Sequence, residues 1–235
     1  MNCQIEPAVS AIGVKTVFGC VEGITNSGLP STWEKERNAR LARLLERYTD
    51  LAVHEDPILE GYHILHDRAG VKRRKNIPSS ENLIKSLLKH RDMPFISLVV
   101  DIYNIISMDS KLCVAAHDQD KIEGNLTVRF SDGSETYVPI GQDHPVAMNP
   151  HEYCYCDDSN EVLCRLEIRQ VNKTKISENV KNVLYIIEGN DATEDDYLKS
   201  VMEEIIKTTI QYCGGHGSLV TPCILPQSGK ERGDF

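Results

Sequence analysis

Apolar residues recur at helical spacing in three stretches of the chain, residues 31–48, 80–90 and 193–213. Each stretch begins with small polar or acidic residues, which are typical of the first turn of a helix. In the first stretch, Ser31 begins a capping box with the glutamate three positions later. A fourth stretch, residues 95–107, is apolar nearly throughout, and its length favours a buried helix over a strand.

The remaining apolar runs are short and rich in Val, Ile, Tyr and Cys, as in β-strands. Strands are expected over residues 9–21 with interruptions at Gly13 and Gly19, and over 113–117, 125–130, 135–140, 153–156, 162–170 and 183–187. Turn residues at 131–134 and 157–160 join neighbouring strands into two hairpins. Helices dominate the first half and strands the second, so the pattern predicts the α+β class.

The charge of the chain is negative and uneven. It has 235 residues and a formal net charge of −9, which argues against a protein that coats nucleic acid through bulk charge. Residues 60–91 carry eight basic and three acidic side chains, so this segment is +5 and the rest of the chain is −14. Its basic turn, which we define as Lys72, Arg73, Arg74 and Lys75, is either a solvated loop or a contact for backbone phosphates.

The sequence also limits location and cofactors. No stretch is apolar enough for a membrane span, and the first residues lack the basic start and apolar core of a signal peptide. We therefore expect a cytoplasmic protein without membrane or DNA partners. Motifs for a catalytic serine, a zinc protease, a phosphate-binding loop and a dinucleotide site are all missing from the sequence, so no cofactor is expected.

Four residues have ligand types that zinc prefers: His151, Cys154, Cys156 and Cys164. They lack the paired CxxC turns of a zinc knuckle. Cys154 and Cys156 also share one face of an expected strand. Structural cysteines are therefore favoured over a metal site.

Two pairs of polar residues interrupt apolar segments. Asp101 and Asn104 lie three positions apart in the expected buried helix, so they share a face and either tie the helix to a neighbour or face a substrate. His117 and Asp118 end an apolar strand. There a histidine can act as a general base that a carboxylate orients, and the alternative is a charged turn.

Several short motifs, in order, resemble a known family. They comprise Ser80–Leu83, Val99–Ser107, Ala116–Ile122, Arg129, Glu135, Asp157, Cys164, Arg169–Gln170, Thr174 and Ile176. This set is similar to the B3/B4 domain of the bacterial phenylalanyl-tRNA synthetase beta chain, and more closely to its free-standing relatives. The match runs from about residue 62 to about residue 189.

The resemblance implies a fold and a domain organisation. The fold is a three-layer (ββα) sandwich of mixed sheets and helices. We expect one domain over residues 1–214, with a strand–helix part over 1–60, the best-matching core over 62–189 and a C-terminal helix over 193–213. Residues 215–235 are rich in Gly and Pro and are expected to form a flexible tail.

The resemblance also implies an activity and a partner. In the synthetase this domain hydrolyses the ester bond of tRNA charged with the wrong amino acid, chiefly tyrosine, so tRNA or aminoacyl-tRNA is the implied partner. Asn104 and Asp118 match the family pattern. They would hold the water or carbonyl and accept the α-ammonium of the substrate, respectively, and are the implied catalytic residues.

The implied substrate pocket departs from the family at several positions. Tyr103 and Ala115 stand where the synthetase has a threonine and a histidine, and His117 takes the place of a phenylalanine. Glu188 is the nearest candidate for the glutamate that reads the tyrosine hydroxyl. Arg169 would meet phosphate or carboxylate, or pair with a buried acid.

Three functions follow. The first is a deacylase that acts on mischarged aminoacyl-tRNA in trans, because an aminoacyl ester is activated and needs a positioned water rather than a strong nucleophile. The second is a non-catalytic tRNA- or RNA-binding module, which Tyr103 and Ala115 favour and in which the basic turn contacts phosphates. The third is a binder of small amino-acid or acyl compounds, which the net charge of −9 favours.

Overall fold

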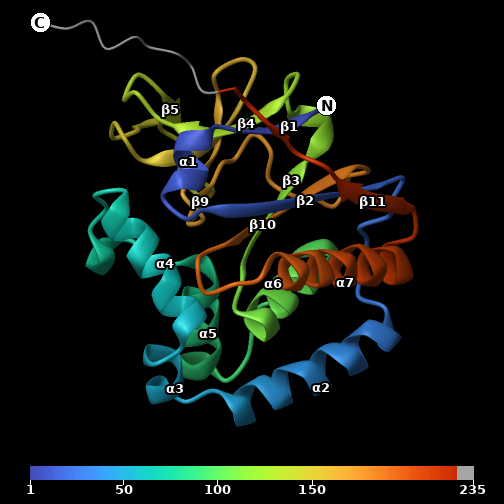
Figure 1. Cartoon of the computed structure of the whole chain (residues 1–235). Coiled ribbons are helices and arrows are strands. Elements are labelled where there is room, and N and C mark those ends of the chain that lie inside the picture. The colour runs from blue at the N-terminus through green and yellow to red at the C-terminus, as the bar shows by residue number, and fades with distance from the viewer. Residues whose placement is uncertain (227–235) are drawn as a thin grey trace, which may run out of the picture.

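Two β-sheets and a layer of helices are stacked on one another (Figure 1). The structure, a computed structural model, describes residues 1–226. A four-stranded middle sheet lies between a six-stranded sheet on one side and helices α6 and α7 on the other. The α+β class and the three-layer sandwich expected from the sequence are confirmed.

The middle sheet is antiparallel throughout. Its order is β11 (His216–Val220), β2 (Lys15–Glu22), β10 (Val183–Gly189) and β3 (Cys113–Asp118). The expected buried strand over 183–187 is its central strand β10, and the strand over 113–117 is its edge β3. Residues from both ends of the chain therefore meet in one sheet.

The six-stranded sheet is mixed. Its order is β12 (Cys223–Ile224), β1 (Cys3–Ile5), β4 (Leu126–Phe130), β7 (Tyr153–Asp157), β8 (Val162–Arg165) and β9 (Arg169–Gln170). Strands β12, β1 and β4 are parallel, and β4, β7, β8 and β9 are antiparallel. The short strands β5 (Thr136–Tyr137) and β6 (Val146–Ala147) pair separately.

The helices lie mainly on the open face of the middle sheet. They are α1 (Pro7–Ala11), α2 (Ser31–Arg47), α3 (Asp50–His54), α4 (Pro57–Arg68), α5 (Ser79–His90), α6 (Leu98–Ser110) and α7 (Asp195–Cys213), with 3-10 turns η1 (Arg73–Lys75) and η2 (Gln119–Lys121). Helix α2 packs below α6 and α7 as an outer layer (Figure 1). No helix within residues 1–226 is long and apolar enough to cross a bilayer.

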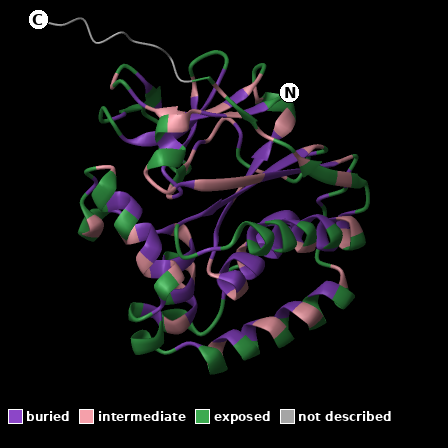
Figure 2. Cartoon of the chain, in the orientation of Figure 1, coloured by how far each residue is buried: buried purple, intermediate pink, exposed green. Residues whose placement is uncertain are grey.

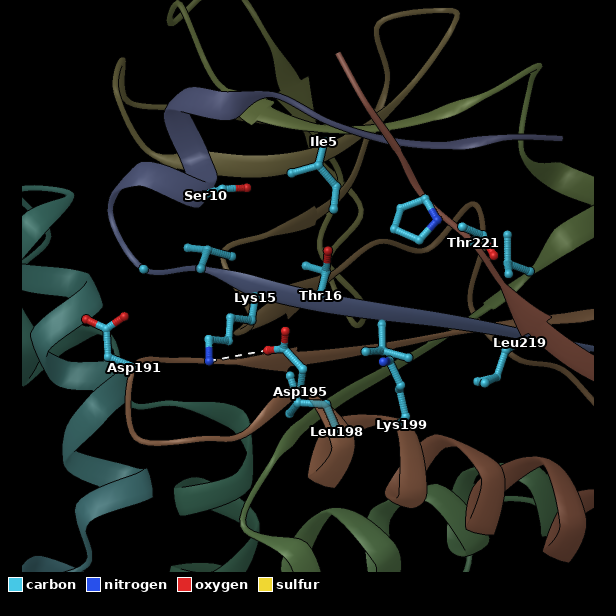
Figure 3. A pocket seen from close by; sticks show the side chains of 15 residues that line it. Ile5, Ser10, Lys15, Thr16, Asp191, Asp195, Leu198, Lys199, Leu219 and Thr221 are labelled. Atoms are coloured by element: carbon cyan, nitrogen blue, oxygen red, sulfur yellow. Dashed lines mark ion pairs between the residues drawn. The ribbon is translucent and has the colours of Figure 1, made fainter. Parts of the chain in front are cut away.

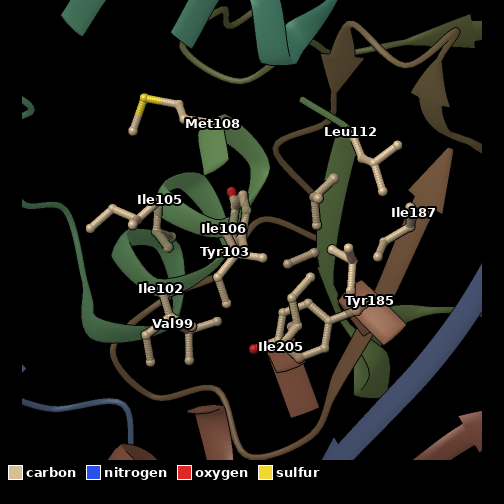
Figure 4. Packing of buried hydrophobic residues seen from close by; sticks show 14 of the residues in the cluster. Val99, Ile102, Tyr103, Ile105, Ile106, Met108, Leu112, Tyr185, Ile187 and Ile205 are labelled. Carbon is tan, nitrogen blue, oxygen red and sulfur yellow. The ribbon is translucent and has the colours of Figure 1, made fainter. Parts of the chain in front are cut away.

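The alternation of β10 separates two cores. Val183, Tyr185 and Ile187 face α6 and α7 in the helical core. Leu184 and Ile186 face the six-stranded sheet in the inter-sheet core. Figure 4 shows the side chains of α6 packed against β10 and α7 in the helical core. Figure 2 shows that the central strand β10 is buried, whereas the edge strand β11 is mainly exposed.

Asp101 fixes the outer helix α2 to the helical core. Trp33 Nε1 donates to its Oδ2 at 2.8 Å, and Arg37 Nε donates to its Oδ1 at 3.1 Å. All three side chains are buried. Of the two roles open to Asp101, the structure therefore shows the tie to a neighbouring element.

Several expected boundaries are wrong. Residues 9–11, expected as strand, lie in helix α1, which Pro7 begins at the first helical position. Gly19 does not interrupt β2; it lies inside the strand, where α7 leaves no room for a side chain. Ser31 lies inside α2 behind the N-cap residue Pro30 and makes no cap, and α3 and α4 were not expected.

The expected hairpin of residues 125–130 with 135–140 is also wrong. Strand β4 pairs with β7, and β5 pairs with β6. The loop between them instead folds around the buried carboxylate of Glu135. Arg129 Nη1 lies 2.5 Å from its Oε1, and the Gly133 N–H donates to its Oε2 at 3.1 Å. The hairpin of β7 with β8 is confirmed.

The expected flexible tail begins too early. Residues 216–220 form β11 on the edge of the middle sheet, and residues 223–224 form β12 on the edge of the six-stranded sheet. Main-chain pairing with β2 and β1 thus orders a segment whose composition is typical of a loop. The last part of the expected tail, residues 227–235, lies outside the described residues.

The close contact at Gly19 predicts a packing defect. A Cβ at Gly19 would lie 2.7 Å from Met202 Sδ and 2.9 Å from Ile206 Cδ1. Gly19→Ala should lower the free energy of unfolding by about 1–3 kcal/mol, because the strand and helix must move apart. Urea denaturation of the same substitution in a Met202→Ala background is the control. The cost should shrink there, and an equal cost in both backgrounds would contradict this packing.

Candidate functional site

Five buried side chains form a hydrogen-bonded chain between the two sheets. The chain runs His66, Glu167, Tyr153, Glu188 and Tyr155, with His66 on α4, Glu188 on β10 and both tyrosines on β7. His66 Nε2 lies 2.6 Å from Glu167 Oε1, and Tyr153 Oη lies 2.6 Å from Glu167 Oε2 and 2.7 Å from Glu188 Oε1. Tyr155 donates to the other oxygen of Glu188. We call this chain the inter-sheet network.

Proton counting fixes the state of the network. The Tyr153 hydroxyl carries one proton but lies between two carboxyl groups, so it donates to one and accepts from the other. One of the two carboxyl groups must then be protonated. Because His66 contacts Glu167, Glu167 is the ionised one, and Glu188 is a neutral acid that donates to Tyr153 Oη.

The directions of the pKa shifts agree with this assignment. Burial, with the nearby charge of Glu167, raises the pKa of Glu188 well above its ordinary value. Burial alone would also raise the pKa of Glu167. The charge and hydrogen bond of His66 outweigh burial, so the pKa of Glu167 is lowered.

The tyrosines leave almost no space beside Glu188. The cavity at this point has a volume of about 10 Å³ and is lined by residues of β3, β7, β8 and β10. One water molecule requires at least that much. Glu188, the expected reader of a substrate hydroxyl, therefore contacts two hydroxyl groups of its own chain.

His117 and Asp118 lie at the far end of β3 from α5. Both are buried, and His117 Nδ1 bonds Thr174 Oγ1 at 2.9 Å. Burial lowers the pKa of His117 to about 4, so its ring is neutral at pH 7. Asp118 Oδ2 lies 3.1 Å from Lys121 Nζ.

Asn104 and Tyr103 come from helix α6, and Ala115 comes from strand β3. Asn104 is half-buried on α6, and Ala115 is half-buried on β3 against the inter-sheet core. Tyr103 faces the helical core, where its ring meets that of Tyr185 edge-on at 6.5 Å. Burial raises the pKa of Tyr103 to about 12. Tyr103 thus packs in the helical core with its hydroxyl near the Gln170 side chain of β9, whereas Ala115 faces the inter-sheet core.

A basic groove opens at the first turn of α5. Its volume is about 260 Å³, and Lys75 and Arg169 lie on its walls with Asn82 and Ser79, whose hydroxyl oxygen is buried. Ile77, Leu83 and Ile168 complete the lining. Lys75 comes from η1 and Arg169 from β9, at the edge of the six-stranded sheet. Two expected contact residues far apart in the sequence therefore meet here.

The basic turn divides into paired and exposed cations. Arg73 lies 2.8 Å from Glu60 Oε1 and 2.5 Å from Asp67 Oδ2, so its charge is compensated. Lys72, Arg74 and Lys75 are exposed. Arg74 lines a second hollow of about 300 Å³ beside His54, His63 and Lys85.

The four candidate zinc ligands lie in different surroundings. Cys154 and Cys156 share a face of β7, as expected, with their Sγ atoms 3.4 Å apart in a small cluster that includes Tyr137 of β5. Cys164 faces the inter-sheet core, and its Sγ donates to the carbonyl of Leu166 at 3.1 Å. His151 is exposed.

The sequence analysis missed Tyr153, Tyr155, His66 and Glu167. A signal was present for the tyrosines, because they alternate with cysteines on a strand that is apolar on both faces. Buried tyrosine hydroxyl groups need partners, and that need points to a polar cluster. The identity of the partners depends on tertiary pairing.

The comparisons with known proteins agree with this architecture. The model of the B3/4 domain family matches residues 67–214. A solved N-terminal fragment of the phenylalanyl-tRNA synthetase beta-subunit from Pyrococcus horikoshii is similar in structure, with a TM-score of 0.51 and 11% sequence identity. The match covers 95% of this chain and 51% of that fragment, so the chain spans about half its length. At this identity the likeness shows the fold alone, and the curated proteins contain no match.

The protonated state of Glu188 predicts the effect of an amide at this position. Glu188→Gln should keep the free energy of unfolding at pH 7 within about 1 kcal/mol, because the amide donates to Tyr153 and its carbonyl accepts from Tyr155. Tyr155→Phe should cost about 1–3 kcal/mol, because it leaves a buried acceptor without a donor. Urea denaturation measures both.

The pH dependence of stability tests whether Glu188 is protonated in the folded protein. The folded-state pKa of Glu188 is raised, so native protein keeps a proton that the unfolded chain releases above about pH 4.3. Stability from this group is present below that pH and is lost as the pH rises. Wild type should therefore lose stability relative to Glu188→Gln between pH 5 and pH 8. A variant that is destabilised at pH 7 by several kcal/mol would show that Glu188 is ionised.

Proposed function

The chain belongs to the B3/4 domain family, and we propose that it binds tRNA at the basic groove and hydrolyses mischarged aminoacyl-tRNA there in trans. The observation that carries this proposal is the convergence of Lys75 and Arg169 on one groove beside α5. The synthetase fragment with a similar fold supports the choice of tRNA over other polyanions.

The surroundings of the groove fit a phosphate backbone. Lys72 and Arg74 extend the positive surface along the basic turn, while the rest of the chain is strongly acidic. Such a surface holds phosphates where the basic residues are and repels nucleic acid elsewhere. This pattern favours a protein that binds one end of an RNA at a single place over one that coats a long strand.

The groove also has donors for ester chemistry. Asn82 supplies an exposed amide at the first turn of α5, and Arg169 supplies its guanidinium N–H groups. Water attack on an aminoacyl ester needs a held water and donors for the developing oxyanion. In this proposal the ester carbonyl of the substrate lies between Asn82 and Arg169, both of which are donors.

A specific observation favours a second function, a non-catalytic tRNA-binding module. Tyr153 and Tyr155 fill the space beside Glu188, where an aminoacyl side chain would otherwise enter between the sheets. If the aminoacyl group of the tRNA cannot enter the inter-sheet core, the basic groove binds only the phosphates and ribose of the tRNA. Binding without turnover is the mark of this alternative.

Neutralising the groove should weaken tRNA binding. Lys75→Ala and Arg169→Ala should each reduce affinity and should each lower the slope of log K against log salt by about 1, because each removes one phosphate contact. Arg73→Ala is the matched control in the same turn, since its charge already pairs with Glu60 and Asp67. Filter binding across a salt series measures the slope. If wild type, Lys75→Ala and Arg169→Ala all gave equal slopes, tRNA would not bind in this groove.

Turnover decides between the two functions. We expect the purified protein to hydrolyse one member of a panel of mischarged tRNAs, and Asn82→Ala to lower kcat by about 10²-fold through loss of one oxyanion donor. The family pattern instead places catalysis at Asn104 and Asp118, so Asn104→Ala and Asp118→Ala locate the reaction. Loss in those two with Asn82→Ala unaffected would move the site away from the groove. Salt-sensitive tRNA binding without hydrolysis of any mischarged tRNA in the panel would show that the protein is a non-catalytic binding module.

A further inference from the structure

A separate cavity lies where β11 leaves β2. Its volume is about 430 Å³, within the usual size of small-molecule sites. Strand β11 pairs with β2 from Glu22 to Phe18, and the chain then crosses to the other sheet through Thr221 and Pro222. The cavity lies between this crossing and residues 14–17 (Figure 3).

The edge of β2 is open at this point. Residues 15–17 pair with β10 on one side, but the pairing with β11 has already ended on the other. Successive residues of a strand turn their N–H and C=O groups to opposite neighbours. At least one of residues 15–17 therefore presents both main-chain groups to the cavity, where an extended ligand can pair with them.

Side chains of both signs surround this edge. Lys15 Nζ lies 3.3 Å from Asp195 Oδ1 and donates to the Thr193 carbonyl at 2.6 Å. Lys199 lies one helical turn after Asp195 on α7, and its amino group points toward β2 in Figure 3 while its Nζ lies 3.5 Å from the exposed Asp196 Oδ1. Asp191 stands on the other side of Lys15. A ligand with one positive and one negative end matches this arrangement.

The rest of the lining is apolar with one unsatisfied hydroxyl. Ile5, Leu198 and Leu219 offer aliphatic surface on three sides. Thr16 lines the cavity, but its Oγ1 has almost no accessible surface and no hydrogen-bond partner within residues 1–226.

We propose that this cavity binds a short peptide of two or three residues with free termini and apolar side chains. Its main chain pairs with the open edge of β2 in the place that β11 leaves. The carboxylate meets Lys199, the ammonium meets Asp195, and the side chains lie against Leu198 and Leu219. This site is separate from the basic groove and does not depend on tRNA.

Calorimetry with four probes tests the chemistry of the ligand. Dileucine should bind the wild-type protein, and N-acetylation or C-terminal amidation should each weaken it by about tenfold or more, because each removes one charged contact. Free leucine should bind more weakly than dileucine, since it lacks the amide that pairs with β2. No binding of dileucine at millimolar concentration, or equal binding of the capped forms, would overturn the proposal. Tighter binding of free leucine would assign the cavity to an amino acid instead.

Variants test the location. In Lys199→Gln, C-terminal amidation of dileucine should no longer weaken binding. In Asp195→Asn, N-acetylation should no longer weaken binding. Each substitution removes the protein charge that the corresponding terminus contacts. Leu219→Trp should block binding by filling the cavity. Lys35→Gln, an exposed lysine on α2, is the matched control. Thermal unfolding of each variant checks that the fold is kept. Unchanged affinities in all three cavity variants, with folding intact, would place the peptide elsewhere.

Discussion

The structure depends on how two buried carboxyl groups share one proton between the sheets. Glu167 and Glu188 are joined through the single hydroxyl of Tyr153, and His66 holds Glu167 ionised. A second negative charge at Glu188 would be buried without a cation, which is far more costly than a neutral acid. The network therefore fixes β7, β10 and α4 relative to one another, and also explains why the inter-sheet space is closed.

That closure limits where a ligand can reach the chain. In this chain the inter-sheet core is filled by tyrosines, and His117 is a neutral buried ring bonded to Thr174. The groups that remain accessible lie where strands end: Arg169 on the short edge strand β9, and Lys15 where β11 leaves β2. Both candidate sites thus occupy edges of the sandwich, and neither needs the interior to open.

Local signals predicted the elements whose pairing is also local. The apolar run over 95–107 gave α6, and the alternation over 153–156 placed Cys154 and Cys156 on one face. The Asp56–Pro57 pair is a helix start, and Asp56 caps α4 through Ile58 N at 3.0 Å, so this signal was available and unused. Gly19 had no local signal, because its reason is the approach of Met202 from a helix 183 positions away.

Prediction of the candidate sites from the sequence was limited even more strongly by tertiary pairing. The cluster of Lys72–Lys75 was visible as charge, but the compensation of Arg73 by Glu60 and Asp67 depends on how α4 ends against η1. Asp118 matched a family pattern, yet strand β3 carries it about 17 Å from Cys113, which contacts α5 beside the basic groove. A motif records which residues are present and in what order. Sheet edges and strand register decide whether those residues converge in space. The convergence of Lys75 and Arg169 on one groove is therefore a stronger reason to propose a site there than the matching positions on β3.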